Sequence, residues 1–368
     1  MFSELPKLFD RDFAIGYFLP MACFVGALYG MLAQFHHTDL IQNIVEIKKI
    51  DTLLGTTLFG LAIWLISVIL LIGNRSLYQL FEGYYWPLNT VRGKRREEDH
   101  FKHLSQKIDD TYAKAKQYRN DEKQVPPELL EEQADLLIVR AERFPYRRRH
   151  ILATKFGNTI RAFETYPKAM YGIDPIEGWL RLLAVVPKDY RQMIDSAKAE
   201  TDFWLNLWFL GYMAAVIHLI FAILFHNFTA LWFLIIFLIF IVICRSAAIT
   251  GAKEWGAISK AAFDVFLPEL YGKLCLLPPS DVDVTSKENL DEETPEWKMW
   301  DAFSRAITYR DPSQLPPRQL GQKNSKMQAG DEEGKAAELP GKEKDTSSAS
   351  SEGAGNKTVS TDAVSTDA

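Results

Sequence analysis

The hydrophobic positions of this chain gather in four long runs, at Phe13–Phe35, Leu53–Gly73, Phe203–Phe225 and Leu231–Thr250. Each run has about 20 residues, the length that an α-helix needs to cross the roughly 30 Å hydrocarbon core of a bilayer. The stretch Leu231–Cys244 has no polar side chain before its cysteine, whereas buried helices of soluble proteins usually carry polar residues on one face. The pattern therefore predicts an all-α integral membrane protein with four spans.

The four runs fall into two pairs with a long charged segment between them. We predict an N-terminal transmembrane hairpin (residues 1–75), a helical cytoplasmic domain (76–202), a second transmembrane hairpin (203–252) and a cytoplasmic helical segment (253–310). Residues 311–368 are rich in Gly, Ser, Lys, Glu and Asp and cannot bury enough surface to offset the entropy of ordering a backbone, so we predict a disordered tail. The whole-chain content of 48% hydrophobic residues hides this division, because the polar segments dilute the spans.

Lysine and arginine residues near the ends of the spans predict the orientation, since cytoplasmic loops carry an excess of both. The link between the first two spans contains Lys48 and Lys49, and the link between the last two contains neither residue type. Basic residues follow the second and fourth spans: Arg75, Arg92, Lys94, Arg95, Arg96, Arg245, Lys253 and Lys260. We therefore predict a multi-pass membrane protein whose N-terminus, central segment and C-terminus are all cytoplasmic.

The central segment has the periodicity of an antiparallel helical pair. Asn120–Asp121 and Pro126–Pro127 predict a turn, and the second helix brings the apolar side chains of Leu129, Leu130, Leu136 and Leu137 to the first. The apolar face of the first helix is predicted to contain Phe101, Leu104, Ile108, Tyr112, Ala115 and Tyr118.

Two further helix starts are visible in the polar segments. Asp174 is predicted to cap a helix that begins at Pro175, with the Glu177 side chain reaching back to the cap. The segment Trp297–Ile307 is amphipathic and is preceded by acidic residues, so we expect it to pack on the protein rather than on anionic lipid.

The stretch Phe163–Asp174, followed by Trp179 and Pro187, resembles a segment of uncharacterised bacterial four-span inner-membrane proteins of unknown function. Asp264, which ends an Ala-Ala-Phe-Asp run, is similar to a residue of the same proteins. The resemblance extends from the first residue to the region of Cys275 and implies a location in the bacterial inner (plasma) membrane. It assigns no function to any residue.

Four polar residues in or beside the spans are candidates for a functional role: Arg245, Asp202, Asn206 and His218. Arg245 lies inside the fourth run, where a charge costs about 3 kcal/mol if it is central. It either lines a pore, pairs across the bundle, or extends to the inner surface, where a contact with Asp202 would be structural. His218 lies in the middle of the third run, where it either donates to a neighbouring helix or relays protons.

A cluster of arginines and a glycine pair are further candidates. The cluster either faces anionic headgroups at the membrane surface or forms a solvated face balanced by acidic neighbours, and it consists of Arg140, Arg143, Arg147, Arg148 and Arg149. Gly26 and Gly30 form a GxxxG motif, which permits close helix packing within the protein or between copies. His36, His37 and His226 fall at the outer ends of the spans and are candidates for metal binding, but nothing fixes their spacing and we expect no bound metal.

The sequence lacks a P-loop, a dinucleotide-binding glycine fingerprint, HExxH, paired CxxC and GxSxG motifs, so we expect no catalytic activity and no cofactor. The net charge of -5 mixes both signs and does not indicate a nucleic-acid partner. These features predict a membrane-anchored helical interaction or scaffold protein. Its expected partners are the lipid bilayer, a cytoplasmic protein and further copies of the same chain.

The alternative is an oligomeric ion channel. The order of spans and cytoplasmic helices is similar in topology to that of the bestrophin anion channels, and Asn74–Tyr78 with Phe81 and Glu82 partly resembles a run of that family. The acidic, proline-containing signature that this family carries after its last span is not found here. Four spans enclose little space, so such a channel would require several copies around one pore.

Overall fold

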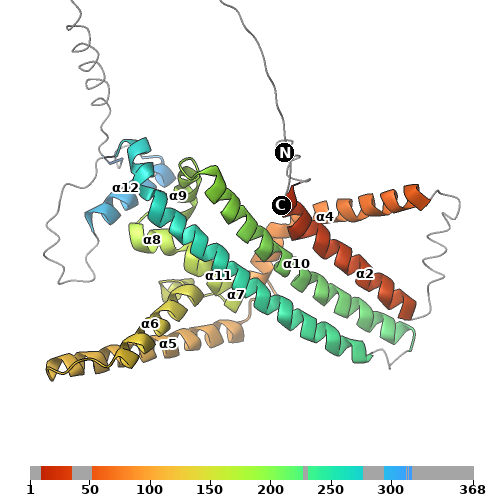
Figure 1. Ribbon diagram of the computed structural model, residues 1–368, viewed down its shortest axis with the longest axis horizontal. Coiled ribbons are helices and arrows are strands. Elements are labelled where there is room, and N and C mark those ends of the chain that lie inside the picture. Colours follow the sequence, from red (N-terminus) through yellow and green to blue (C-terminus); the bar gives the residue numbers. More distant parts are fainter. Residues whose placement is uncertain are drawn as a thin grey trace, which may run out of the picture. The chain divides into compact units, whose positions relative to one another are not determined.

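The computed structural model describes residues 10–34, 52–226, 231–276 and 294–311, together with residues 313, 315 and 316. Every element in this part of the chain is a helix (Figure 1). The predicted all-α class is therefore confirmed for the described residues, and the predicted tail beyond Pro316 lies outside them.

Four helices are long and apolar enough to cross a membrane, as the four hydrophobic runs predict. The first is continuous through α1 (Arg11–Phe13), η2 (Ala14–Phe18) and α2 (Leu19–Gln34), and the others are α4 (Thr52–Glu82), α10 (Lys188–Leu224) and α11 (Trp232–Leu274). The last three exceed the length that a bilayer core requires, so each continues from apolar into polar sequence without a break.

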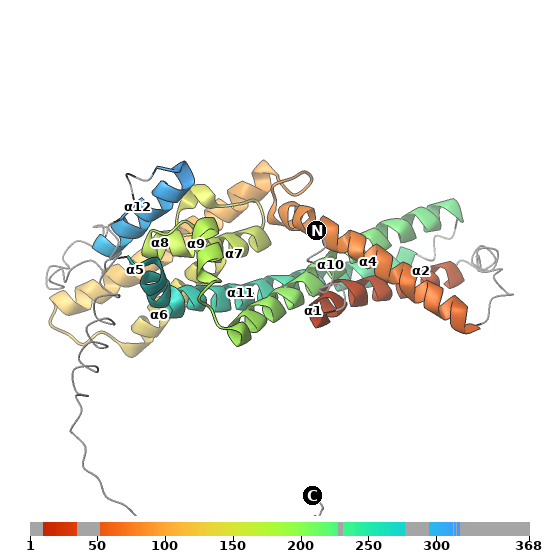
Figure 2. The same cartoon turned by 90° about the horizontal axis from the view of Figure 1, so that it is seen from above.

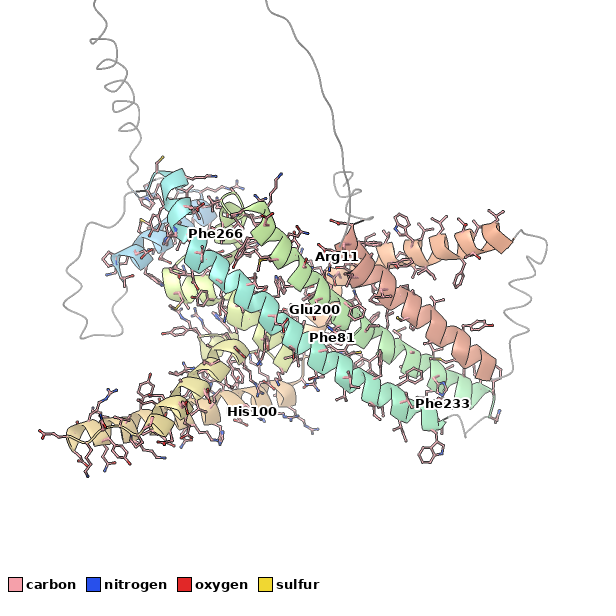
Figure 3. All side chains as sticks on the ribbon, viewed as in Figure 1. Arg11, Phe81, His100, Glu200, Phe233 and Phe266 are labelled. Atoms are coloured by element: carbon pink, nitrogen blue, oxygen red, sulfur yellow. The ribbon has the colours of Figure 1, made fainter. Side chains whose placement is uncertain are left out.

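Helices α10 and α11 lie side by side in both views (Figures 1 and 2). Glycines permit their close approach: a Cβ atom on Gly211 would lie 3.2 Å from Ile241, and one on Gly251 would lie 3.2 Å from Thr201. Phe233 lies at the apolar end of α11 and Phe266 at its polar end (Figure 3). Around Phe233 large aliphatic side chains are exposed, as expected for a helix whose solvent is hydrocarbon.

The main core lies where α4, α10 and α11 meet α7 (Lys155–Glu164). The rings of Phe81 and Trp208 have centroids 4.0 Å apart, and Phe156 packs on the same indole at 6.2 Å. The Thr154 hydroxyl donates to the carbonyls of Phe81 and Glu82 at 2.7 and 2.9 Å and accepts from the backbone N–H of Gly157 at 3.0 Å. One side chain thus caps α7 and satisfies carbonyls at the end of α4.

Helices α5 (Val91–Asn120) and α6 (Pro127–Arg143) form the predicted antiparallel pair. The buried residues of α5 are spaced by three, four or seven positions and so lie on one face: Glu97, Phe101, Ile108, Thr111 and Ala115. Tyr112 and Tyr118 of α5 and Leu130 and Leu137 of α6 are exposed, so the prediction that they face the partner helix is wrong. Thr111 can be buried because its hydroxyl donates to the Ile108 carbonyl at 2.8 Å, which satisfies the polar group within the helix. Its methyl group is then available for packing.

The remaining helices surround the polar ends of α10 and α11. They are α8 (Tyr166–Tyr171), α9 (Pro175–Leu182) and α12 (Pro295–Tyr309), whereas η3 (Arg148–His150) contacts α5 through the ion pair between Arg148 and Glu98. Trp300 and Phe303 of α12 are buried in a second core with Phe266 and Leu182. The prediction that this amphipathic segment packs on the protein is therefore confirmed.

The chain turns into α9 through a cap that differs in part from the prediction. Asp174 accepts from the backbone N–H groups of Ile176 and Glu177 at 3.1 and 3.4 Å, as predicted. The Glu177 side chain does not reach back to this cap but pairs with Arg181 at 2.6 Å, because an arginine one turn later offers a charged partner. Gly172 has a φ of 75° and lies against the backbone of Trp297, where a Cβ atom would not fit.

Candidate functional site

The most distinctive polar site is the Asp202 centre, defined here as Asp202, Tyr17, Asn74, Tyr78 and Lys198. Asp202 lies on α10 and is 2% exposed. Its Oδ2 atom accepts from Tyr17 Oη at 2.8 Å and from Lys198 Nζ at 2.7 Å. Its Oδ1 atom accepts from Tyr78 Oη at 2.8 Å and from Asn74 Nδ2 at 3.3 Å. The carboxylate therefore joins α10 to α4 and to the first span.

The backbone of the first span is adapted to this centre. Residues 14–18 form a π-helical turn, a local widening that often occurs at functional sites. Gly16 in this turn faces α10, and a Cβ atom there would lie 3.4 Å from the Cβ of Asp202. Asn206 Nδ2 donates to the Gly16 carbonyl at 2.7 Å, so the widened turn is held by the same face of α10.

The chemistry of the Asp202 centre is that of a compensated buried charge. The Lys198 side chain is 40% exposed and links the carboxylate to solvent at one side. Hydroxyl and ammonium donors to an ionised carboxylate make the stronger kind of hydrogen bond, and their loss leaves a costly buried charge. Within the described residues, Asn74 Oδ1 and Asn206 Oδ1 are buried without a hydrogen-bond donor. The arrangement can hold three helices in register and has spare oxygen acceptors.

Asp202 and Asn206 were identifiable from the sequence, whereas Tyr17, Asn74, Tyr78 and Lys198 were missed. Lys198, Asp202 and Asn206 are spaced four residues apart, and this spacing alone could have indicated a polar stripe on one helix face. The other three residues lie on the first span (Tyr17) and on α4 (Asn74 and Tyr78). The sequence around them gives no local signal for a contact with Asp202.

Arg245 lies on α11 with an exposed side chain. The cation that pairs with Asp202 is Lys198, so the contact between Arg245 and Asp202 considered from the sequence is not formed. Lys198 is favoured because it lies one turn from Asp202 on the same helix.

A second polar site, the Lys155 cluster, consists of Lys155, Arg143, Lys253 and Arg245 and lies where α7 begins beside α11. Burial lowers the pKa of Lys155, and the positive charges of Arg143, Lys253 and Arg245 lower it further, although Glu97 acts in the opposite direction. Cations from α6 and α11 therefore act on Lys155, and two of them, Arg143 and Lys253, also pair with Glu97 and Glu142.

The predicted arginine cluster is divided among several contacts. Arg143 pairs with Glu97 at 3.3 Å, and Arg148 pairs with Glu98 at 3.0 Å. The Arg140 guanidinium lies 5.5 Å from the centre of the Phe101 ring. Arg147 and Arg149 are exposed. Arg140 and Arg143 therefore hold α6 on α5, and Arg148 joins the following η3 turn to α5.

The other candidates are placed apart from these sites. His218 is buried on α10, with its ring 5.6 Å from that of Phe237. A Cβ atom on Gly26 or Gly30 would have no neighbouring atom within 4 Å, so within the described residues neither glycine packs against another helix. His226 follows α10 with a φ of 51°, and His36 and His37 lie outside the described residues. Within the described part of the chain, no group of three or more His, Cys, Asp or Glu side chains is arranged for a metal.

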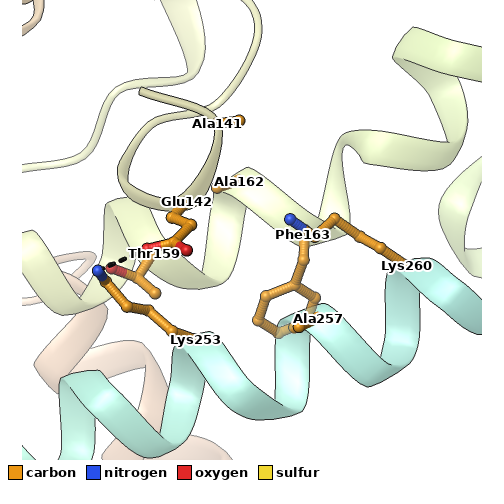
Figure 4. Close-up of a pocket in the computed structure, with 9 residues that line it drawn as sticks. Ala141, Glu142, Thr159, Ala162, Phe163, Lys253, Ala257 and Lys260 are labelled. Carbon is orange, nitrogen blue, oxygen red and sulfur yellow. Dashed lines mark hydrogen bonds and ion pairs between the residues drawn. The ribbon is translucent and has the colours of Figure 1, made fainter. Parts of the chain in front are cut away.

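Two hollows in the described residues are small. One of about 50 Å³ lies between α6, α7 and α11, where Lys253 pairs with Glu142 at 2.7 Å and Phe163 lies beside Ala257 (Figure 4). Another, of about 70 Å³, lies between α2, α10 and α11 and is almost entirely apolar. Each has room for a few water molecules, whereas small-molecule sites typically measure about 300–1,000 Å³.

No known protein family, curated protein or solved structure matches this chain. The resemblance to bacterial four-span proteins therefore stays a prediction. Its residues do lie together: Tyr166 and Tyr171 both donate to Asp264, at 2.7 and 2.5 Å, and the rings of Trp179 and Phe263 are 5.9 Å apart.

Proposed function

We propose that this chain is a scaffold protein of the bacterial inner membrane that presents a helical docking arm in the cytoplasm. The arm is the α5–α6 pair. The observation that carries this function is the surface of α6, which has no buried residue and exposes Leu130, Leu137 and Ile138. A helix outside the spans that exposes apolar side chains at helical spacing is suited to receive a partner helix.

The attachment of this arm supports a scaffold. Its base is tied to the long helices by the ion pair between Glu142 and Lys253, and α6 packs on α7. Figure 1 shows α5 and α6 extending away from the other helices. The arm is thus attached at its base, while the apolar surface of α6 stays available for a partner.

The topology in this proposal is two transmembrane hairpins with the charged helices and both termini in the cytoplasm. It is supported by the excess of basic residues after the second and fourth spans and by the continuation of α4, α10 and α11 into polar sequence. The small hollows offer little room for a small-molecule substrate, so the arm surface is the better basis for a function.

The test is a comparison of proteins that co-purify with the full chain in mild detergent. The triple variant Leu130→Ser/Leu137→Ser/Ile138→Ser removes the apolar surface of α6. The matched control Ile176→Ser/Leu180→Ser removes two strongly exposed apolar side chains from α9. A protein recovered with the wild type and the control but lost with the arm variant supports the scaffold. Identical recovery with all three chains contradicts it.

The channel alternative has one favourable observation. Arg245, Ser246 and Thr250 are all exposed on the surface of α11, where they form a polar patch beside an apolar run. Several copies that share this patch around an axis could line a polar path. Bilayer recording tests it: the wild type should conduct and Arg245→Ala should alter conductance, and absence of wild-type conductance ends the alternative. Mass determination of the detergent-solubilised chain separates a monomer from a ring.

A further inference from the structure

The side-by-side packing of α7 and α11 determines where the Lys155 cluster lies. A Cβ atom on Gly256 would clash with the Phe163 ring, and Thr159 and Lys253 line the same hollow. The two helices therefore run parallel to each other. Lys155 lies one turn before Thr159, so it lies beside the part of α11 that precedes Lys253 and that begins with Arg245. The electrostatic influence of Arg245 on Lys155 agrees with this placement.

The charges in this cluster are not balanced. Arg143 pairs with Glu97 at 3.3 Å and Lys253 pairs with Glu142 at 2.7 Å. Within the described residues, no carboxylate lies within ion-pair distance of Lys155 or Arg245. Two cations therefore lack an ion-pair contact within the described residues, although Glu97 partly offsets the charge of Lys155, and such an excess of positive charge attracts an anionic group.

Two features place the cluster at the level of lipid headgroups. Arg245 is exposed and follows the uninterrupted apolar stretch Leu231–Cys244 within the fourth run, so its guanidinium must reach a polar layer. Thr154, the neighbour of Lys155, bonds the end of α4, after which Tyr85 and Trp86 are 52% and 85% exposed. Exposed tyrosine and tryptophan at the end of a span are typical of the membrane–water interface.

We propose that Lys155 and Arg245 bind the phosphate of an anionic phospholipid of the inner leaflet. Arg245 supplies a planar donor from the lipid-facing side of α11, and Lys155 supplies an ammonium group from the start of α7. The lipid then bridges a span and the soluble helices. This site does not depend on the docking arm, since neither residue lies on α5 or α6.

The test is native mass spectrometry of the full chain in detergent, titrated with phosphatidylglycerol or with the zwitterionic phosphatidylethanolamine. The wild type should retain phosphatidylglycerol preferentially. Lys155→Ala/Arg245→Ala should weaken this binding at least about tenfold, because each cation near a surface contributes measurably to anionic-lipid affinity. The control Lys102→Ala/Lys107→Ala, which removes two exposed cations from α5, should bind as the wild type does.

The charge-conserving variant Lys155→Arg/Arg245→Lys keeps the site testable if the alanine variant fails to fold, and it should retain most of the binding. Equal phosphatidylglycerol binding by the wild type and the alanine variant overturns the site, as does an equal loss in the α5 control. Displacement of the lipid by millimolar inorganic phosphate would assign the site to a free anion and overturn the lipid assignment.

Discussion

At the residue scale, the Asp202 centre illustrates how one charge can be held inside an apolar bundle. A carboxylate that is 2% exposed accepts from two tyrosine hydroxyls, one ammonium group and one amide. Each of these donors lowers the cost of burying the charge, and three of them come from helices other than α10. The centre therefore contributes to the packing of these helices as well as to the charge balance.

We expect Asp202→Asn to lower the free energy of unfolding by about 2 kcal/mol and Tyr78→Phe to lower it by about 1 kcal/mol. The amide cannot accept at both former oxygen positions, and Lys198 loses its partner while staying partly solvated. Thermal unfolding of the full chain in detergent measures both. Tyr85→Phe, which removes an exposed hydrogen bond to Gln79, is the control and should unfold like the wild type. Unchanged stability in the first two variants would contradict a structural role for the centre.

His150 provides a pH-dependent contribution. Burial lowers its pKa below the ordinary value of 6.5, and the neighbouring positive charges of Arg149, Arg161 and Arg147 lower it further. The unfolded chain then takes up a proton at a higher pH than the folded chain does. Stability is therefore lost as the pH falls from about 6.5 toward the folded pKa. His150→Asn should reduce the difference between the melting temperatures at pH 7.5 and pH 5.5, whereas His103→Asn on exposed α5 should leave it unchanged.

At the element scale, the contact between α4 and α7 depends on the absence of a side chain. A Cβ atom on Gly157 would overlap the carbonyl of Glu82, where the chain leaves α4. The Thr154 hydroxyl bonds the same carbonyl at 2.9 Å, so the two helix ends are held at a distance that only glycine permits. This contact attaches α7 directly to the end of α4.

We expect Gly157→Ala to destabilise the protein by about 3 kcal/mol, because α7 must move away from the end of α4. Gly60→Ala is the matched control, since a Cβ atom there meets nothing within 4 Å and alanine favours the helix. Unfolding in detergent compares the two, with the control expected at or slightly above wild-type stability. Equal behaviour of both variants would mean that the two helix ends can separate without cost.

The element scale also separates what periodicity predicts from what it does not. The turn between α5 and α6 and the burial of Trp300 and Phe303 follow from spacing and proline positions. Periodicity does not predict that Thr111 is buried and Tyr112 is exposed, because these neighbouring residues both lie at the edge of the predicted apolar face. Packing against a particular neighbour decides such cases.

At the scale of the whole molecule, three of the four apolar helices extend into the polar part of the protein as single helices. α10 and α11 have 37 and 43 residues. At about 1.5 Å per residue, each is roughly twice as long as a bilayer core is thick. The apolar and polar parts of the chain are therefore joined by continuous helical rods rather than by loops.

The orientation of these rods in the membrane can be measured. In a chain whose three native cysteines are replaced by serine, we expect a cysteine in place of the exposed His226 to react with a membrane-impermeant maleimide in intact cells. A cysteine at Lys107 of α5 should react only after the membrane is permeabilised. The reason is the excess of lysine and arginine on the side of α5. The reverse pattern would place the charged helices outside the cytoplasm.

The sequence by itself determined the helical class and the four apolar helices, because both depend on local periodicity and on run length. It also marked Asp202, Asn206 and Arg245 as polar residues in unusual places. Only the tertiary structure decided their partners. Tyr17, Asn74 and Tyr78 reach Asp202 from helices distant in sequence, and Arg245 acts electrostatically on Lys155 because α7 packs along α11. The cost of an isolated charge in an apolar setting can be read from one segment, but its compensation depends on which helices pack together.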